Sequence, residues 1–107
     1  MTDTVSKTGH DEIVRRSALL LMMRGYEVRA RIEDWFEPPD VICGYRPDIL
    51  ATRANSFLIV EVEKGPTDWP KICALRAFKN GHADYRLVVI PLAAQYDNER
   101  LSAAIGG

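Results

Sequence analysis

The sequence predicts an α/β domain with an αβββαβ core, in which helices flank a mixed central sheet. Three observations indicate this fold: two segments with helical periodicity, four segments with strand character, and their order along the chain. The helical segments are residues 9–24 and 69–80, and the strand segments are residues 26–34, 48–52, 57–63 and 85–90. Helices and strands that alternate in this way pack the helices against a sheet.

The first helix and the first strand are separated by a glycine. Residues 9–24 present a broad apolar side, and Gly25 lies where a helix C-cap belongs. Over residues 26–34 the apolar period changes to two. The apolar members are Val28, Ala30 and Ile32, and the charged members are Glu27, Arg29, Arg31 and Glu33. We therefore expect a half-buried strand with one face in water.

Two strands joined by a short turn follow a loop. The loop, residues 35–46, contains Pro38-Pro39 and Gly44. Residues 48–52 form a short strand, residues 53–56 a turn, and residues 57–63 the strongest strand of the chain. Gly65-Pro66 ends this strand. The two strands are expected to form a hairpin.

The second helix has recognisable ends. Pro70 suits the first helical turn, Asp68 or Thr67 suits the N-cap, and Gly81 follows the last helical residue. Residues 85–90 are β-branched and almost entirely apolar, which is typical of a central buried strand. Residues 93–105 are expected to form a weak terminal helix.

The totals are those of one folded domain. A length of 107 residues with 47% hydrophobic side chains supports a single packed core. We expect residues 1–8 to be a flexible N-terminus and residues 9–107 to form the domain. The polar N-terminus is unlike a signal peptide and no apolar run could span a bilayer, so a cytoplasmic protein without a membrane segment is expected.

Charge and cysteine content argue against binding of nucleic acid through overall charge and against a cysteine zinc site. The formal net charge of -1 gives no overall attraction to nucleic acid, so DNA binding depends on where the charges lie. Cys43 and Cys73 lack the spacing of a zinc site.

Three acidic residues are placed to form a cluster. Glu61 and Glu63 lie on one face of the strand at residues 57–63, with their Cα atoms roughly 6.5–7 Å apart. Asp48 begins the partner strand, and the hairpin would bring it near Glu61. Such carboxylates repel one another unless a cation neutralises them. Mg²⁺, with Mn²⁺ as a substitute, suits a site made of Asp48, Glu61 and Glu63.

These residues carry a resemblance to a known family. Pro47-Asp48, followed by Glu61-Val62-Glu63-Lys64 at the end of an apolar strand, resembles the PD-(D/E)xK motif of restriction-endonuclease-like nucleases. The order of elements over residues 11–91 is similar to the αβββαβ core of that family, and above all to small archaeal-type and phage Holliday junction resolvases. The resemblance implies a Mg²⁺-dependent endodeoxyribonuclease that is a homodimer and acts on branched or structured DNA.

The chain departs from the family pattern at the lysine. Glu63 occupies the usual lysine position, and Lys64 follows on the opposite side of the strand. The resemblance leaves Lys71, on the next helix, and Lys64 as the candidate catalytic lysines. For the family's first-helix carboxylate it implies Glu12, with Asp11 as the alternative, whereas His10 is interpreted as a helix-start residue. The alternative function is a catalytically degenerate nuclease fold that binds DNA or protein.

Several arginines are candidates for binding DNA phosphates. The set comprises Arg29, Arg31, Arg46 and Arg53. For Arg29 and Arg31, ion pairs with the glutamates on the same strand face are the alternative interpretation.

Overall fold

The computed structural model has the predicted order of helix, three strands, helix and strand. It describes residues 2–33, 35, 37–92 and 101, with side chains from residue 9 onward. The elements are α1 (Thr2–Met23), β1 (Glu27–Ala30), β2 (Ile49–Arg53), β3 (Ser56–Glu63), α2 (Trp69–Asn80) and β4 (Tyr85–Pro91), and a 3₁₀ turn, η1 (Pro66–Asp68), precedes α2. The α/β fold predicted from the sequence is confirmed.

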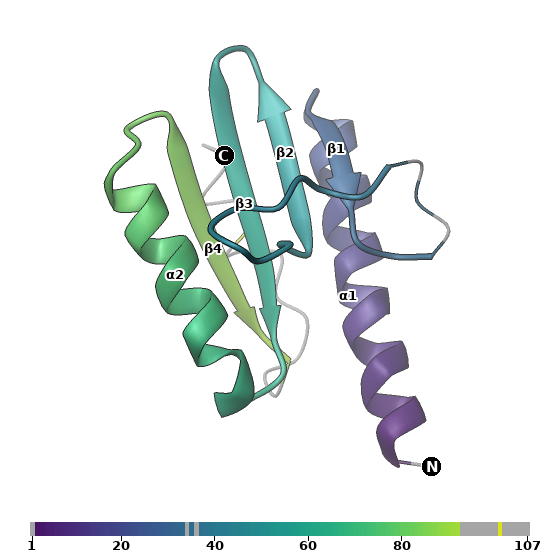
Figure 1. Ribbon diagram of the computed structural model, residues 1–107. Helices are drawn as coiled ribbons and strands as arrows, with labels where there is room; N and C mark the ends of the chain where they lie inside the picture. Colours follow the sequence, from purple (N-terminus) through teal and green to yellow (C-terminus); the bar gives the residue numbers. More distant parts are fainter. Residues whose placement is uncertain (1, 34, 36, 93–100, 102–107) are drawn as a thin grey trace.

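The four described strands form one mixed sheet in the order β1-β2-β3-β4. β1, β2 and β3 are antiparallel neighbours, and β4 runs parallel to β3 (Figure 1). In β2 and β3, Ile49 pairs with Val60 and Arg53 with Ser56, so the predicted hairpin is present. A parallel neighbour requires a crossover connection, which here is α2.

The two faces of β3 support two separate hydrophobic clusters. Leu58, Val60 and Val62 are buried with the apolar side of α1, whereas Ile59 is buried with Leu75 of α2. This division follows from the period of two in a strand. Because both faces are covered, β3 is a continuous apolar run until it reaches Glu61.

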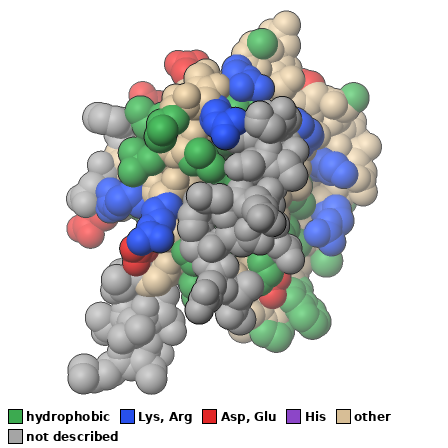
Figure 2. Space-filling view, turned by 180° about the vertical axis from the view of Figure 1, so that it is seen from behind, with side chains coloured by type: hydrophobic (Ala, Val, Ile, Leu, Met, Phe, Trp, Pro, Cys, Tyr) green, Lys and Arg blue, Asp and Glu red, His purple; other side chains and the backbone are tan. Residues whose placement is uncertain are grey.

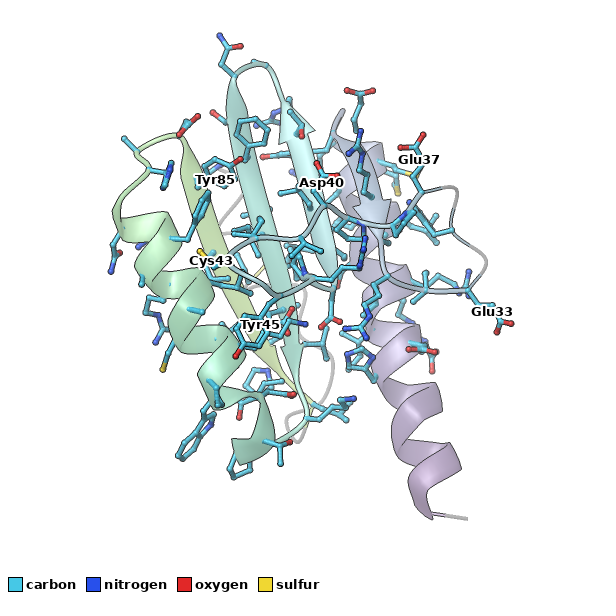
Figure 3. The ribbon with its side chains drawn as sticks, in the orientation of Figure 1. Glu33, Glu37, Asp40, Cys43, Tyr45 and Tyr85 are labelled. Carbon is cyan, nitrogen blue, oxygen red and sulfur yellow. The ribbon has the colours of Figure 1, made fainter. Side chains whose placement is uncertain are left out.

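The loop between β1 and β2 also covers the sheet. It first extends outward to Glu33 and then crosses the face that α2 occupies, from Asp40 over the sheet to Cys43 next to α2 (Figures 1 and 3). Its Ile42 is buried in the α2-side cluster. A two-residue turn follows, in which Ile42 and Tyr45 exchange both backbone hydrogen bonds. Cys43 and Gly44 there have φ of 52° and 81°, a conformation that Gly44 adopts without steric cost.

Three boundaries or positions differ from those expected. α1 begins at Thr2 rather than near residue 9. β1 ends at Ala30 rather than near residue 34. The Arg31 amide still donates to the Asp48 carbonyl at 2.8 Å, and the Ala30 amide donates to the Glu37 carbonyl of the loop that follows. The placement of residues 85–90 at the centre of the sheet is wrong, since β4 lies at the edge of the described strands. Its apolar composition instead reflects two covered faces: Val88 and Ile90 join the α1-side cluster, and Leu87 packs on the α2-side cluster.

The expected terminal helix at residues 93–105 lies outside the described residues except for Leu101. Leu101 is helical and is buried in the α1-side cluster. Neither α1 nor α2 combines the length and the apolar character that a bilayer crossing requires.

Candidate functional site

Asp48 and Glu61 meet at the end of the sheet where β2 begins and β3 ends. The Asp48 amide donates to Glu61 Oε1 at 2.9 Å, and the Val62 amide donates to Asp48 Oδ2 at 2.8 Å. The antiparallel pairing of Ile49 with Val60 explains this contact. It sets Asp48, the residue before Ile49, beside Glu61, the residue after Val60. Asp48 is 3% exposed and Glu61 is 2% exposed. Two carboxylates are thus buried side by side, as the hairpin predicted.

Lys71 from α2 completes this arrangement. Its Nζ lies 2.7 Å from Glu61 Oε2, and its side chain is 14% exposed. The short η1 connection returns the chain over the end of the sheet, so that the first turn of α2 faces the end of β3. Of the two candidate lysines, Lys71 is the one that contacts the carboxylates.

His10 of α1 contacts the same pair from the other side. Its Nε2 lies 3.2 Å from Asp48 Oδ2, and its Nδ1 lies 3.1 Å from Asp11 Oδ1. The His10 side chain is 12% exposed. The interpretation of His10 as a helix-start residue is wrong, because α1 begins at Thr2 and His10 lies one turn before buried Val14. If the helix is extended to residues before Gly9, its periodicity places His10 on the same side as Val14, which faces the core.

A cleft of about 900 Å³ opens over these residues. Asp48, Glu61 and Lys71 line it together with His10 and Asp11. Arg31 and Lys64 add positive charge to its walls, and Glu33 and Asp68 add negative charge. The two carboxylates thus lie in the wall of this cleft, although little of either side chain is exposed.

Burial and mutual repulsion set opposite protonation tendencies for the two carboxyl groups. Burial and the Asp48 charge raise the pKa of Glu61 to about 7, although Lys71 and the Asp48 amide act in the opposite direction. Burial also acts to raise the pKa of Asp48, but the hydrogen bond and charge of His10, the Val62 amide and Lys71 together hold it below its ordinary value. Of the two carboxyl groups, Glu61 is therefore the one whose unfavourable buried charge a bound proton or cation would neutralise.

The pKa of His10 follows from the same contacts. Burial acts to lower it, but the hydrogen bond and charge of Asp48 and the hydrogen bond of Asp11 raise it above its ordinary value. The imidazolium form is therefore favoured while Asp48 is ionised.

The other predicted acidic residues lie apart from the pair. Glu63 is half-buried at the end of β3 and is absent from the cleft lining. Glu12 is exposed and pairs with Arg16 at 2.7 Å, so Asp11 is the first-helix carboxylate that reaches the cleft. Within the described part of the chain, no three His, Cys, Asp or Glu side chains converge closely enough to hold a metal ion. Asp48 and Glu61 are brought together, but Glu63 is not.

Lys64 lines the cleft from its exposed rim. Its amide donates to Asp68 Oδ2 at 2.6 Å, which fixes the turn that leads into α2.

The four candidate DNA-binding arginines have different surroundings. Arg31 lines the cleft. Arg29 pairs with Glu37 at 3.4 Å and Asp40 at 3.2 Å, rather than with the glutamates of its own strand, and borders a separate hollow of about 580 Å³.

The remaining two arginines contact the protein backbone. Arg46 donates to the Pro39 carbonyl, and Arg53 donates to the Arg24 carbonyl at 3.0 Å while it covers the Tyr26 ring. On the face seen in Figure 2, the described lysine and arginine side chains lie in separate groups and form no continuous stripe. Among the four arginines, Arg31 is the one positioned beside the carboxylates.

Fold and site together define an α/β protein with a buried carboxylate pair, a lysine and a histidine at one end of a mixed sheet. Comparison of the chain with protein-family models, with curated proteins and with solved structures gave no match. The geometry of the site and the resemblance of its motif are therefore the observations that bear on function.

Proposed function

We propose that this protein is a metal-dependent endodeoxyribonuclease that hydrolyses DNA phosphodiester bonds. The observation that carries the proposal is the buried pair of Asp48 and Glu61 with the Lys71 ammonium 2.7 Å from Glu61, all lining one cleft. These residues include the acidic positions of the PD-(D/E)xK resemblance. Lys71 supplies from α2 the positive charge that the sequence lacks at Glu63.

The carboxylate pair fits a hard divalent cation. No described residue donates to Asp48 Oδ1, which leaves that oxygen for a ligand. The pKa of Glu61 is raised by its burial and by the charge of Asp48 in spite of the Lys71 ion pair, so a further positive charge at the carboxylate pair would favour the ionised form. Mg²⁺ commonly uses one or two carboxylates and completes its shell with water and substrate phosphate oxygens. Asp48 and Glu61 would thus hold Mg²⁺ or Mn²⁺ without Glu63.

Each residue of the site has a role in this reaction. A bound divalent cation would polarise the scissile phosphate and lower the pKa of a water molecule. Lys71 places a fixed positive charge where negative charge develops on the phosphate during attack. Arg31 and Lys64, on the cleft walls, bind phosphates that flank the scissile bond.

The resemblance to small Holliday junction resolvases extends the proposal to the substrate. Branched or structured DNA is the favoured substrate, and a homodimer is the favoured assembly. Two cuts related by a two-fold axis require two sites with the same symmetry.

A second function is favoured by the charge of the cleft. Five acidic residues line the cleft against three lysines and arginines: the acidic ones are Asp11, Glu33, Asp48, Glu61 and Asp68, and the basic ones are Arg31, Lys64 and Lys71. Without a cation this excess of acidic residues, which the His10 imidazolium offsets in part, disfavours a phosphate backbone. A catalytically degenerate domain that binds a protein partner is therefore the alternative.

Metal binding separates the two functions by thermal unfolding. Mg²⁺ or Mn²⁺ that binds only the folded state is expected to raise the melting temperature, by about 10 °C or more once the ion reaches roughly 100 times its Kd. Glu61→Gln should abolish the shift. Glu27→Gln removes an exposed glutamate outside the cleft and should retain it. A wild-type melting temperature that neither ion changes would favour the degenerate domain.

A further inference from the structure

His10 lies between two carboxylates that belong to different parts of the fold. Its Nε2 contacts Asp48 Oδ2 at 3.2 Å, and its Nδ1 contacts Asp11 Oδ1 at 3.1 Å. Because a partner on each ring nitrogen fixes both the position and the plane of an imidazole, the orientation of the His10 ring is defined. The ring is also mostly buried, at 12% side-chain exposure.

The His10 contact determines which oxygen of Asp48 remains for a ligand. Oδ2 already accepts the Val62 amide at 2.8 Å, and His10 adds a second contact to the same oxygen. Oδ1 has no donor among the residues that the structure describes. The carboxylate is therefore held at Oδ2 by two elements, β3 and α1, while its other oxygen is left for the cleft.

We infer that His10, held in place by Asp11, is a positioning residue that orients the Asp48 carboxylate for a divalent cation. This inference rests on the proposed function. Hydrogen bonds from residues behind a metal ligand fix the direction of the ligand and strengthen metal binding. The β3 amide alone leaves the Asp48 side chain free to turn about that bond. His10 removes this freedom from the α1 side.

Divalent-cation binding and catalysis by three variants test the inference. In His10→Leu the contact with Asp48 is lost, and the Mn²⁺ or Mg²⁺ concentration at half-saturation should rise about 10–100-fold. The cleavage rate at saturating metal should change much less. In His10→Gln, the side-chain amide can again reach Asp48, so most of the affinity should return. His82→Gln changes the other histidine, which stacks on Phe78 outside the cleft, and should bind metal like the wild type.

Mn²⁺ titration followed by electron paramagnetic resonance measures the affinity independently of DNA cleavage. Asp11→Ala supplies a second variant, because its side chain is 40% exposed and its loss threatens the fold less than that of His10. It should weaken Mn²⁺ binding in the same direction. If His10→Leu fails to fold, Asp11→Ala and His10→Gln together decide the question.

Distinct results would overturn the inference. Wild-type Mn²⁺ affinity in folded His10→Leu, or in Asp11→Ala, would show that the contact does not act on Asp48. Nitrogen coupling in the Mn²⁺ signal, lost in the His10 variants, would make His10 a metal ligand instead of a positioning residue. If the wild-type protein binds neither ion, the proposed function fails together with the inference, whereas metal binding and cleavage that are indifferent to His10 overturn the inference alone.

Discussion

Replacing Lys71 with methionine is expected to lower the rate of metal-dependent DNA cleavage about 10²–10³-fold. The Lys71 ammonium is 2.7 Å from Glu61 and is the positive charge nearest to the carboxylate pair in the described contacts. Its loss would remove the fixed charge that stabilises the phosphate as it is attacked. The rate is measured on labelled DNA at saturating Mg²⁺. Lys71→Arg keeps a positive charge with a different shape and should retain part of the activity.

The stability of the variant must be measured beside its activity. Lys71→Met leaves a buried carboxylate without its cation, so the free energy of unfolding should fall, and more at pH 8 than at pH 6, where Glu61 can take up a proton. Lys79→Met removes a lysine from the last turn of the same helix, away from the cleft, and serves as the matched control. Full cleavage activity in folded Lys71→Met would contradict the role assigned to Lys71.

The metal-free protein is expected to lose stability as the pH rises from about 5 to about 8. Glu61 binds its proton more tightly in the folded chain, with a pKa of about 7 against 4.5, so its contribution is present below 4.5 and is lost as the pH rises through 7. The difference corresponds to about 3 kcal/mol, which is an upper value for this pair. The pKa of His10 is also raised, and its contribution is likewise lost above its folded value.

Urea unfolding in a metal chelator at several pH values measures this loss. Glu61→Gln cannot titrate at this position, so most of the decline should disappear and the smaller slope due to His10 should remain. Asp48 affects stability at acidic pH. Because its pKa is lowered in the folded state, Asp48 stabilises the fold above about pH 3.8, and this contribution is lost as the pH falls through the pKa of Asp48 in the folded protein. A wild-type stability that is constant or rises between pH 5 and pH 8 would contradict the raised pKa of the buried Glu61.

Local patterns in the sequence predict most of the fold. The period of two over residues 57–63 and the Pro70 and Gly81 signals lie within single elements, and the observed β3 and α2 agree with them within one residue. The meeting of Asp48 with Glu61 was also predictable, because the register of a short hairpin follows from its turn. These features depend on residues that are close in the chain.

Features that depend on long-range packing could not be predicted in this way. The contact of His10 with Asp48 joins residues 38 apart, and it requires both the start of α1 and its placement against the sheet. The edge position of β4 could not be predicted from its composition. An edge strand with both faces covered is as apolar as a central strand. Arg46 and Arg53 are candidates for DNA binding from the sequence, but Arg46 donates to the Pro39 carbonyl within its own loop, and Arg53 donates to the Arg24 carbonyl, 29 residues away.

The most direct test of the nuclease proposal is cleavage of labelled four-way junction, duplex and single-stranded DNA with Mg²⁺ or Mn²⁺, with the wild type beside Glu61→Ala. We expect metal-dependent cutting by the wild type, strongest on the branched substrate, and none by Glu61→Ala. Cutting that survives in Glu61→Ala would place the activity elsewhere. Absence of cutting of any DNA by the wild-type protein in both metals would contradict the assignment of this site as a nuclease centre.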